Sequence, residues 1–218
     1  MPVPRQGLAK KMTIKPPEEG IIWEWRAFGR LDPKLESKIR ALPIRNGVVD
    51  HSDEDVYLVS PATDQNVKIR KVGTFWVLKF KELLEKGTDS IELYREGQDT
   101  VFGFPVTSGA LTTAAALLNT KVPGPLSDTD RYGREELVNI LADSIPKIRA
   151  LDVPKVRSQF VVNGGWVELA EATFPKGNIQ TLSLHSFEKS KVQQNLEFLE
   201  PAGELNVMNY IDACRRWG

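Results

Sequence analysis

Charged side chains recur at i, i+2 spacing in segments whose other residues are typical of β-strands. The pairs are Glu24 and Arg26, Lys68 and Arg70, Lys79 and Lys81, and Lys155 and Arg157. Because residues i and i+2 of a strand point to the same face, each strand would carry a charged face opposite an apolar one. Two interpretations follow: the charged faces meet solvent, or the sheet closes on itself and they line a basic tunnel.

Composition limits the class of protein. The chain has 218 residues, 41% of them hydrophobic, which is enough for one domain with a substantial core. Lys and Arg number 29 and Asp and Glu number 29, and this balance argues against a DNA-binding protein. No apolar run approaches the ~20 residues that span a bilayer. The single cysteine, Cys214, excludes an internal disulfide and indicates the cytoplasm or the reducing interior of an organelle.

The start of the chain differs in composition from the rest. Residues 1–20 are rich in Pro and Lys and are predicted to form a flexible arm, and they lack the apolar segment of a secretion signal. Residues 21–218 are predicted to form a single domain.

Strand-like and helical segments alternate along this domain. Strands are expected at 21–29, 55–60, 66–72, 75–81, 90–96, 158–163, 166–174 and 181–187. Helices are expected at 33–42, 107–119, 134–145, 189–199 and 205–217. This order predicts an α+β fold with about eight antiparallel strands and with inserted and C-terminal helices. Eight strands are the smallest number that comfortably closes around an interior, so we expect a closed or nearly closed β-barrel.

The order of elements and charges resembles the CYTH family, the triphosphate tunnel metalloenzymes, over roughly residues 21–213. The first strand of that family carries Glu-x-Glu-x-Lys, where this chain has Ile22, Glu24 and Arg26. DVYLVSP, VKIRKVG and VLKFK are similar to the family's Asp-x-Tyr-Phe segment, Leu-Arg-Ile-Arg strand and Thr-Leu-Lys strand. VELAEATF resembles its later acidic strand, and TLSLHSFEKSKVQQNLEFL resembles its closing strand and helix.

The resemblance implies a tunnel whose basic side chains bind a triphosphate-containing ligand or nucleotide, with Mg²⁺ or Mn²⁺ held by an acidic cluster. The implied phosphate-binding residues are Arg26, Lys68, Arg70, Lys81 and Arg157. Glu24 and Lys79 are the implied catalytic residues, and Glu24, Glu92 and Glu171 the implied metal ligands. Glu168 and Glu171 face opposite sides of a regular strand, so at most one of them would reach the lumen unless a bulge intervenes. The implied reaction is metal-dependent hydrolysis of tripolyphosphate or of a nucleoside triphosphate.

Ile22 is the main departure from the family pattern, because it stands where the family has its first carboxylate. The sequence therefore leaves two functions open: a metal-dependent triphosphatase, and a non-catalytic binding or assembly module that acts through a protein partner. A lipocalin-like barrel for an apolar ligand is less consistent with the sequence, because its lumen should be apolar. The lone His185 is expected to be structural rather than a general base.

Overall fold

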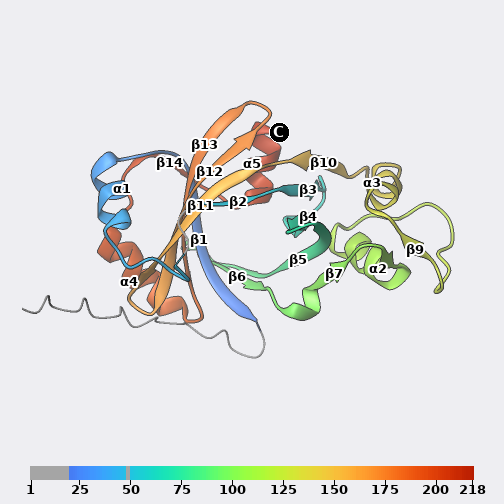
Figure 1. The fold of residues 1–218 in the computed structure, drawn as a ribbon, viewed down its shortest axis with the longest axis horizontal. Helices are drawn as coiled ribbons and strands as arrows, with labels where there is room; N and C mark the ends of the chain where they lie inside the picture. The colour runs from blue at the N-terminus through green and yellow to red at the C-terminus, as the bar shows by residue number, and fades with distance from the viewer. Residues whose placement is uncertain (1–19, 48–49) are drawn as a thin grey trace, which may run out of the picture.

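A computed structural model describes residues 20–47 and 50–218 (Figure 1). Apart from Gly20, the arm predicted for residues 1–20 lies outside the described residues. In the described part, twelve strands form one antiparallel sheet, and two short strands form a second sheet. The large sheet contains β1 (Ile21–Leu31), β2 (His51–Asp53), β3 (Asp55–Val59), β4 (Asn66–Val72), β5 (Phe75–Lys86), β6 (Glu92–Arg95), β7 (Val101–Gly103), β10 (Arg149–Asp152), β11 (Lys155–Val162), β12 (Gly165–Phe174), β13 (Gly177–Ser186) and β14 (Gly203–Val207). The small sheet contains β8 (Val106–Thr107) and β9 (Arg131–Tyr132).

The strands of the large sheet follow the order β10-β3-β4-β5-β6-β1-β13-β12-β11-β2, with β14 also paired to β1 and β7 to β5. Within the described residues, the end strands β10 and β2 do not pair with each other, so the strand ladder does not close into a barrel. The chain nevertheless brings the two ends together. Glu54 alone separates β2 from β3, Val153 and Pro154 separate β10 from β11, and the N–H of Val153 donates to the carbonyl oxygen of Asp55 at 2.8 Å. The predicted α+β class and antiparallel sheet are confirmed.

In residues 20–47 and 50–218, five α-helices and one 3-10 helix surround the sheet. They are α1 (Pro33–Arg40), α2 (Ser108–Leu117), α3 (Arg134–Ala142), α4 (Lys189–Leu199), α5 (Tyr210–Trp217) and the 3-10 helix η1 (Gln98–Thr100). Helices α1 and α4 lie on one side of the molecule, and α2 and α3 lie at the opposite end (Figure 1). None of the helices in the part of the chain that the structure describes is long and apolar enough to cross a membrane.

The first helix shows how local sequence fixes an element. The Asp32 carboxylate accepts hydrogen bonds from the N–H groups of Lys34 and Leu35, and Pro33 occupies the first helical position. Leu35 and Ile39 lie one turn apart and are buried, so they place the helix against the sheet.

Three apolar clusters hold the layers together. In one, Leu35, Ile39 and Val192 of α1 and α4 pack against the apolar residues of β1, β11, β12 and β13. In another, α2 and α3 cover the apolar faces of β3, β4 and β5. In the third, α5 packs against Phe28, Tyr57 and Phe174. Helices thus cover the apolar faces of β1, β4, β5 and β11, which leaves the charged faces of these strands turned inward.

All of the strands and helices expected from the sequence are present, but one helix begins later than expected. Residues 203–207 form β14, and α5 begins at Tyr210, so the helix predicted from 205 was wrong at its start. The side chain of Asn209 accepts a hydrogen bond from the N–H of Asp212 and caps the helix there. Strand β14 lies so close to β1 that a Cβ atom at Gly29 would come within 1.9 Å of the carbonyl oxygen of Glu204.

Candidate functional site

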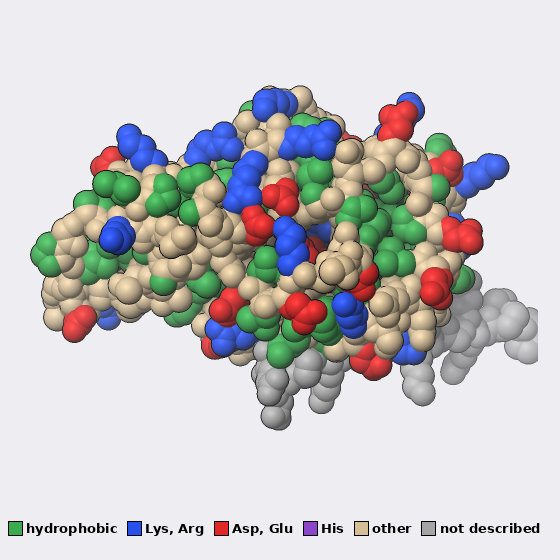
Figure 2. All heavy atoms as spheres, turned by 180° about the vertical axis from the view of Figure 1, so that it is seen from behind, with side chains coloured by type: hydrophobic (Ala, Val, Ile, Leu, Met, Phe, Trp, Pro, Cys, Tyr) green, Lys and Arg blue, Asp and Glu red, His purple; other side chains and the backbone are tan. Residues whose placement is uncertain are grey.

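A cavity of about 910 Å³ is lined by the charged faces of the strands. Eight Lys and Arg residues from β1, β4, β5, β11 and the loop after α1 line it. They are Arg26, Arg45, Lys68, Arg70, Lys79, Lys81, Lys155 and Arg157. Basic and acidic side chains also lie side by side near the middle of one face of the molecule (Figure 2). The charged faces predicted from the i, i+2 spacing therefore converge on an interior cavity.

Helix α5 contributes its first residue, Tyr210, to the cavity wall. Tyr210 lines the cavity and stacks on Tyr57 with ring centroids 5.2 Å apart, and Phe28 meets it edge-on at 5.1 Å. Phe28 follows Arg26 on the inward face of β1, and Tyr57 follows Asp55 on the inward face of β3. The inward faces of these strands are therefore charged at the cavity and apolar beneath α5.

Glu24 is the centre of the first ionic cluster. One carboxylate oxygen accepts from Nε of Arg26 at 2.7 Å, and the other accepts from Nζ of Lys81 and lies 3.3 Å from Nδ1 of His185. Burial alone would raise the pKa of Glu24, but the charges of Arg26 and Lys81 outweigh it and hold this pKa well below its ordinary value. Glu24 is therefore ionised and firmly bound to cations.

His185 closes this cluster from β13. Burial lowers its pKa to about 4, so the ring is neutral at pH 7. The ring stacks on Trp166 with a centroid distance of 5.0 Å, and Nε2 lies 2.8 Å from the Ser183 hydroxyl. These contacts fix the ring, and the structural role expected from the sequence stays a prediction.

Glu168 of β12 organises a second cluster, and only β13 lies between its strand and β1. It accepts from Nη1 of Arg157 at 2.9 Å, from Nε2 of Gln159 at 2.8 Å and from Nη2 of Arg26 at 3.4 Å. Arg26 therefore bridges the Glu24 and Glu168 carboxylates.

Asp55 organises a third cluster at the start of β3. Arg70 donates to it through Nε at 2.6 Å and Nη2 at 2.7 Å, Lys155 lies 2.9 Å from it, and Lys68 donates at 3.2 Å. The strand register places Asp55 directly opposite Arg70. Burial alone would raise the pKa of Asp55, but these three cations hold it well below its ordinary value.

The cations around the cavity outnumber the carboxylates. The eight basic side chains face six carboxylates, those of Glu24, Asp53, Asp55, Glu96, Asp99 and Glu168, which leaves an excess of two positive charges. Among the residues that the structure describes, Arg45 has no carboxylate partner; it donates to the Gln159 side chain at 2.9 Å and lies 3.9 Å over the Trp166 ring. Burial and the charge of Arg70 hold the pKa of Lys68 well below its ordinary value. The excess of positive charge favours the entry of an anion.

Two buried polar groups at the cavity have no hydrogen-bond partner within the described part of the chain. They are the hydroxyl of Tyr210 and Oδ1 of Asn66. Burial raises the pKa of Tyr210, so its hydroxyl stays protonated and can donate a hydrogen bond. Buried polar groups are normally satisfied, so these two groups indicate contact with a ligand or water.

The predicted phosphate-binding residues Arg26, Lys68, Arg70, Lys81 and Arg157 all line this cavity, as does Lys79. Glu24 is buried beside it. The structure pairs Glu24 of β1 directly with Glu92 of β6, but Glu171 does not join them. Glu92 is held by the Tyr94 hydroxyl at 2.5 Å and by Asn209 at 3.2 Å, and burial raises its pKa.

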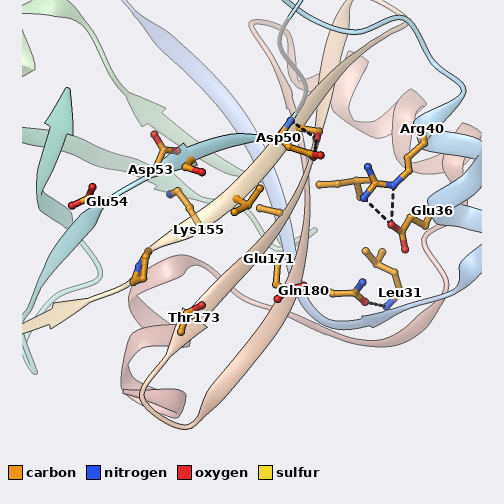
Figure 3. Close-up of a pocket in the computed structure, with 16 residues that line it drawn as sticks. Leu31, Glu36, Arg40, Asp50, Asp53, Glu54, Lys155, Glu171, Thr173 and Gln180 are labelled. Carbon is orange, nitrogen blue, oxygen red and sulfur yellow. Dashed lines mark hydrogen bonds and ion pairs between the residues drawn. The ribbon is translucent and has the colours of Figure 1, made fainter. Parts of the chain in front are cut away.

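Glu171 lies on the opposite face of β12 from Glu168, as strand alternation requires. It is exposed, and it lines a separate hollow of about 470 Å³ beside α1, together with Leu31, Glu36 and Gln180 (Figure 3). An outward-facing side chain on this strand cannot join a metal cluster around Glu24, so the placement of Glu171 in that cluster was wrong.

The residues present do not fit a divalent cation of the kind the family implies. Within residues 20–47 and 50–218, no three His, Cys, Asp or Glu side chains gather in a metal-binding arrangement. Ile22 lines the cavity where the family carries a carboxylate, and the neighbouring Glu24 carboxylate is bound to Arg26 and Lys81. Metal dependence stays a prediction of the resemblance alone.

Several site residues were not selected from the sequence. Lys155 shares the i, i+2 pattern with Arg157, and Asp55 begins the DVYLVSP segment, so a signal existed for both. Arg45 lies in a loop and Tyr210 on the last helix, where no strand periodicity could point to the cavity.

No family model matches the chain, and no curated protein matches it. Among solved structures, a putative adenylyl cyclase from Hippeastrum, described as having a dominant triphosphatase activity, is 15% identical with a TM-score of 0.50. This match covers 89% of this chain and 95% of that one. A putative adenylate cyclase from Bacillus halodurans is 12% identical with a TM-score of 0.50, covering 89% of this chain and 98% of that one. At these identities the similarity concerns the fold, which is CYTH-like, as the sequence resemblance predicts.

Proposed function

We propose that the cavity binds a polyphosphate-containing ligand, such as tripolyphosphate or a nucleoside triphosphate. The observation that carries this proposal is the convergence of eight Lys and Arg side chains, from four strands and one loop, on one cavity. The strands would enclose the ligand as a tunnel that α5 closes at one end. The similarity of fold to a Hippeastrum protein described as a triphosphatase supports the same class of ligand.

The chemistry of the lining suits phosphate groups. Lys and Arg donate charge-assisted hydrogen bonds to phosphate oxygens, and the guanidinium fork can bind two of them at once. The excess of cations over carboxylates provides the attraction, and an anion beside Lys68 would offset the burial and the charge of Arg70 that lower its pKa. The unpartnered Tyr210 hydroxyl would donate to the innermost phosphate.

The direct test is isothermal titration of the protein with tripolyphosphate, using two lysine variants. Lys79→Gln removes a cation that lines the cavity, whereas Lys71→Gln removes a cation from the neighbouring strand β4. Lys71 pairs with Glu54 at the surface and does not line the cavity. The pair therefore separates a cavity effect from a general loss of positive charge.

We expect Lys79→Gln to weaken binding by about 10-fold or more, because a hydrogen bond to a charged group contributes about 1.5–3 kcal/mol. Lys71→Gln should change the affinity less than about twofold, since its charge is exposed and screened. Equal losses in the two variants, or no heat of binding in the wild type, would overturn the proposal.

Release of phosphate from the bound ligand decides whether the protein is also an enzyme. The predicted catalytic residues give a sharp test, because turnover that survives both Glu24→Gln and Lys79→Ala unchanged would not come from this cavity. If the wild type binds tripolyphosphate without turnover, the site is a binding module. If it binds no phosphate ligand, the alternative of an assembly module with a protein partner remains, to be sought by pull-down.

A further inference from the structure

We infer that this cavity takes up its polyphosphate ligand in the metal-free form, with fixed Lys and Arg side chains supplying the positive charge that a divalent cation would bring. This inference rests on the proposed function and adds the chemical form of the ligand. It is carried by the occupancy of the carboxylate oxygens around the cavity.

The Glu24 carboxylate, the nearest match to the family's acidic motif, has both oxygens engaged. Arg26 binds one of them at 2.7 Å, and Lys81 binds the other. Both partners are themselves buried at the cavity wall, so neither can swing into solvent to make room for a cation.

Glu168, Asp55 and Glu96 are engaged in the same way. Each oxygen of Glu168 faces an arginine, Arg26 at 3.4 Å and Arg157 at 2.9 Å. Both oxygens of Asp55 face Arg70. One oxygen of Glu96 pairs with Lys79, and the other lies 3.9 Å from Lys81.

A magnesium ion needs carboxylate oxygens that are free to coordinate it, together with phosphate oxygens and water. Here an incoming cation would have to displace a buried ammonium or guanidinium group and would then lie beside that like charge. Ile22 offers no ligand at the position where a first carboxylate would relieve this repulsion. The same lysines and arginines can instead turn spare N–H donors toward phosphate oxygens.

A consequence for solution behaviour follows. Tripolyphosphate binds Mg²⁺ in water, so added Mg²⁺ converts free ligand into its magnesium complex. A site that recognises the metal-free anion should then show a weaker apparent affinity. A site that needs the metal should instead bind tripolyphosphate more tightly when Mg²⁺ is added.

The test is isothermal titration with tripolyphosphate in three buffers of the same ionic strength. One contains EDTA, one has no additive, and one contains MgCl₂ at roughly ten times the ligand concentration. We expect the affinity with EDTA to equal that without additive, and excess Mg²⁺ to weaken it at least threefold. Binding that disappears in EDTA and returns with Mg²⁺ overturns this inference while leaving the proposed function intact. Absence of binding in all three buffers refutes the proposed function, and the inference with it.

Ile22→Glu provides the matched variant, because it adds a carboxylate on the cavity side of β1, two residues from Glu24. We expect this variant to lose the discrimination against Mg²⁺, with its affinity falling less than in the wild type when Mg²⁺ is added. Thermal unfolding of the variant checks that it is folded, and Ile22→Gln, which keeps the size without the charge, should behave as the wild type. If Ile22→Glu responds to Mg²⁺ in the same way as Ile22→Gln, the explanation based on a missing carboxylate ligand is contradicted.

Discussion

Replacement of Asp55 by Asn tests whether the ionic clusters stabilise the fold. Asp55 is buried, and it is the carboxylate that Lys68, Arg70 and Lys155 all approach within 3.2 Å. The substitution keeps the size of the side chain but leaves three cations without their anion. Breaking a buried ion pair from one side costs about 3–5 kcal/mol of unfolding free energy. For a chain of this size that corresponds to a melting temperature lower by about 6–20 °C.

The loss should depend on pH. The cations hold the pKa of Asp55 well below its value in the unfolded chain, so its contribution to stability is fully present above about pH 4. As the pH falls below this value, the unfolded state takes up a proton and the advantage of the carboxylate declines. The difference between Asp55→Asn and wild type should therefore be largest near pH 7 and should shrink below about pH 4.

Urea unfolding followed by tryptophan fluorescence measures both effects. The control is Glu204→Gln, which removes one partner of the ion pair with Arg30, whose two side chains are each 75% exposed. An exposed pair contributes about 0–1 kcal/mol, so this variant should unfold almost like the wild type. If Asp55→Asn were no less stable than Glu204→Gln, or if its deficit did not change with pH, the argument for a stabilising cluster would be refuted.

Three further predictions concern single groups. Tyr210→Phe should weaken tripolyphosphate binding about 10-fold without lowering the melting temperature, because it removes a hydroxyl that has no partner in the described chain. The control Tyr132→Phe, which lies outside the cavity, should bind tripolyphosphate like the wild type in the same titration. An anion should raise the low pKa of Lys68, so binding should take up protons in the pH range where Lys68 titrates, and the affinity should fall as the pH rises through that range. Equal heats, throughout that range, in buffers of different ionisation enthalpy would contradict this. Burial raises the pKa of Cys214 to about 12, so iodoacetamide should label it at pH 8 only after unfolding; rapid labelling of the native protein would exclude this burial.

Local sequence determined which residues share a face and where several elements begin. Arg26 falls on the same side of its strand as Glu24 because side chains alternate with a period of two. Likewise α1 begins at Pro33 because Asp32 caps it. These features depend on neighbours within a few residues, so periodicity and capping rules were sufficient to predict them.

Only the tertiary structure decided that the charged faces point inward. A period of two separates two faces, but the side that meets solvent depends on which faces the helices cover, and here they cover the apolar ones. The pairing of Asp55 with Arg70 depends on the register between β3 and β4, and the contribution of Tyr210 depends on where α5 docks. These contacts join residues that are distant in the chain, and a local pattern carries no information about such distances. The same reason explains why the sequence suggested a metal cluster, whereas the folded chain places Glu171 outside and surrounds Glu24 with cations.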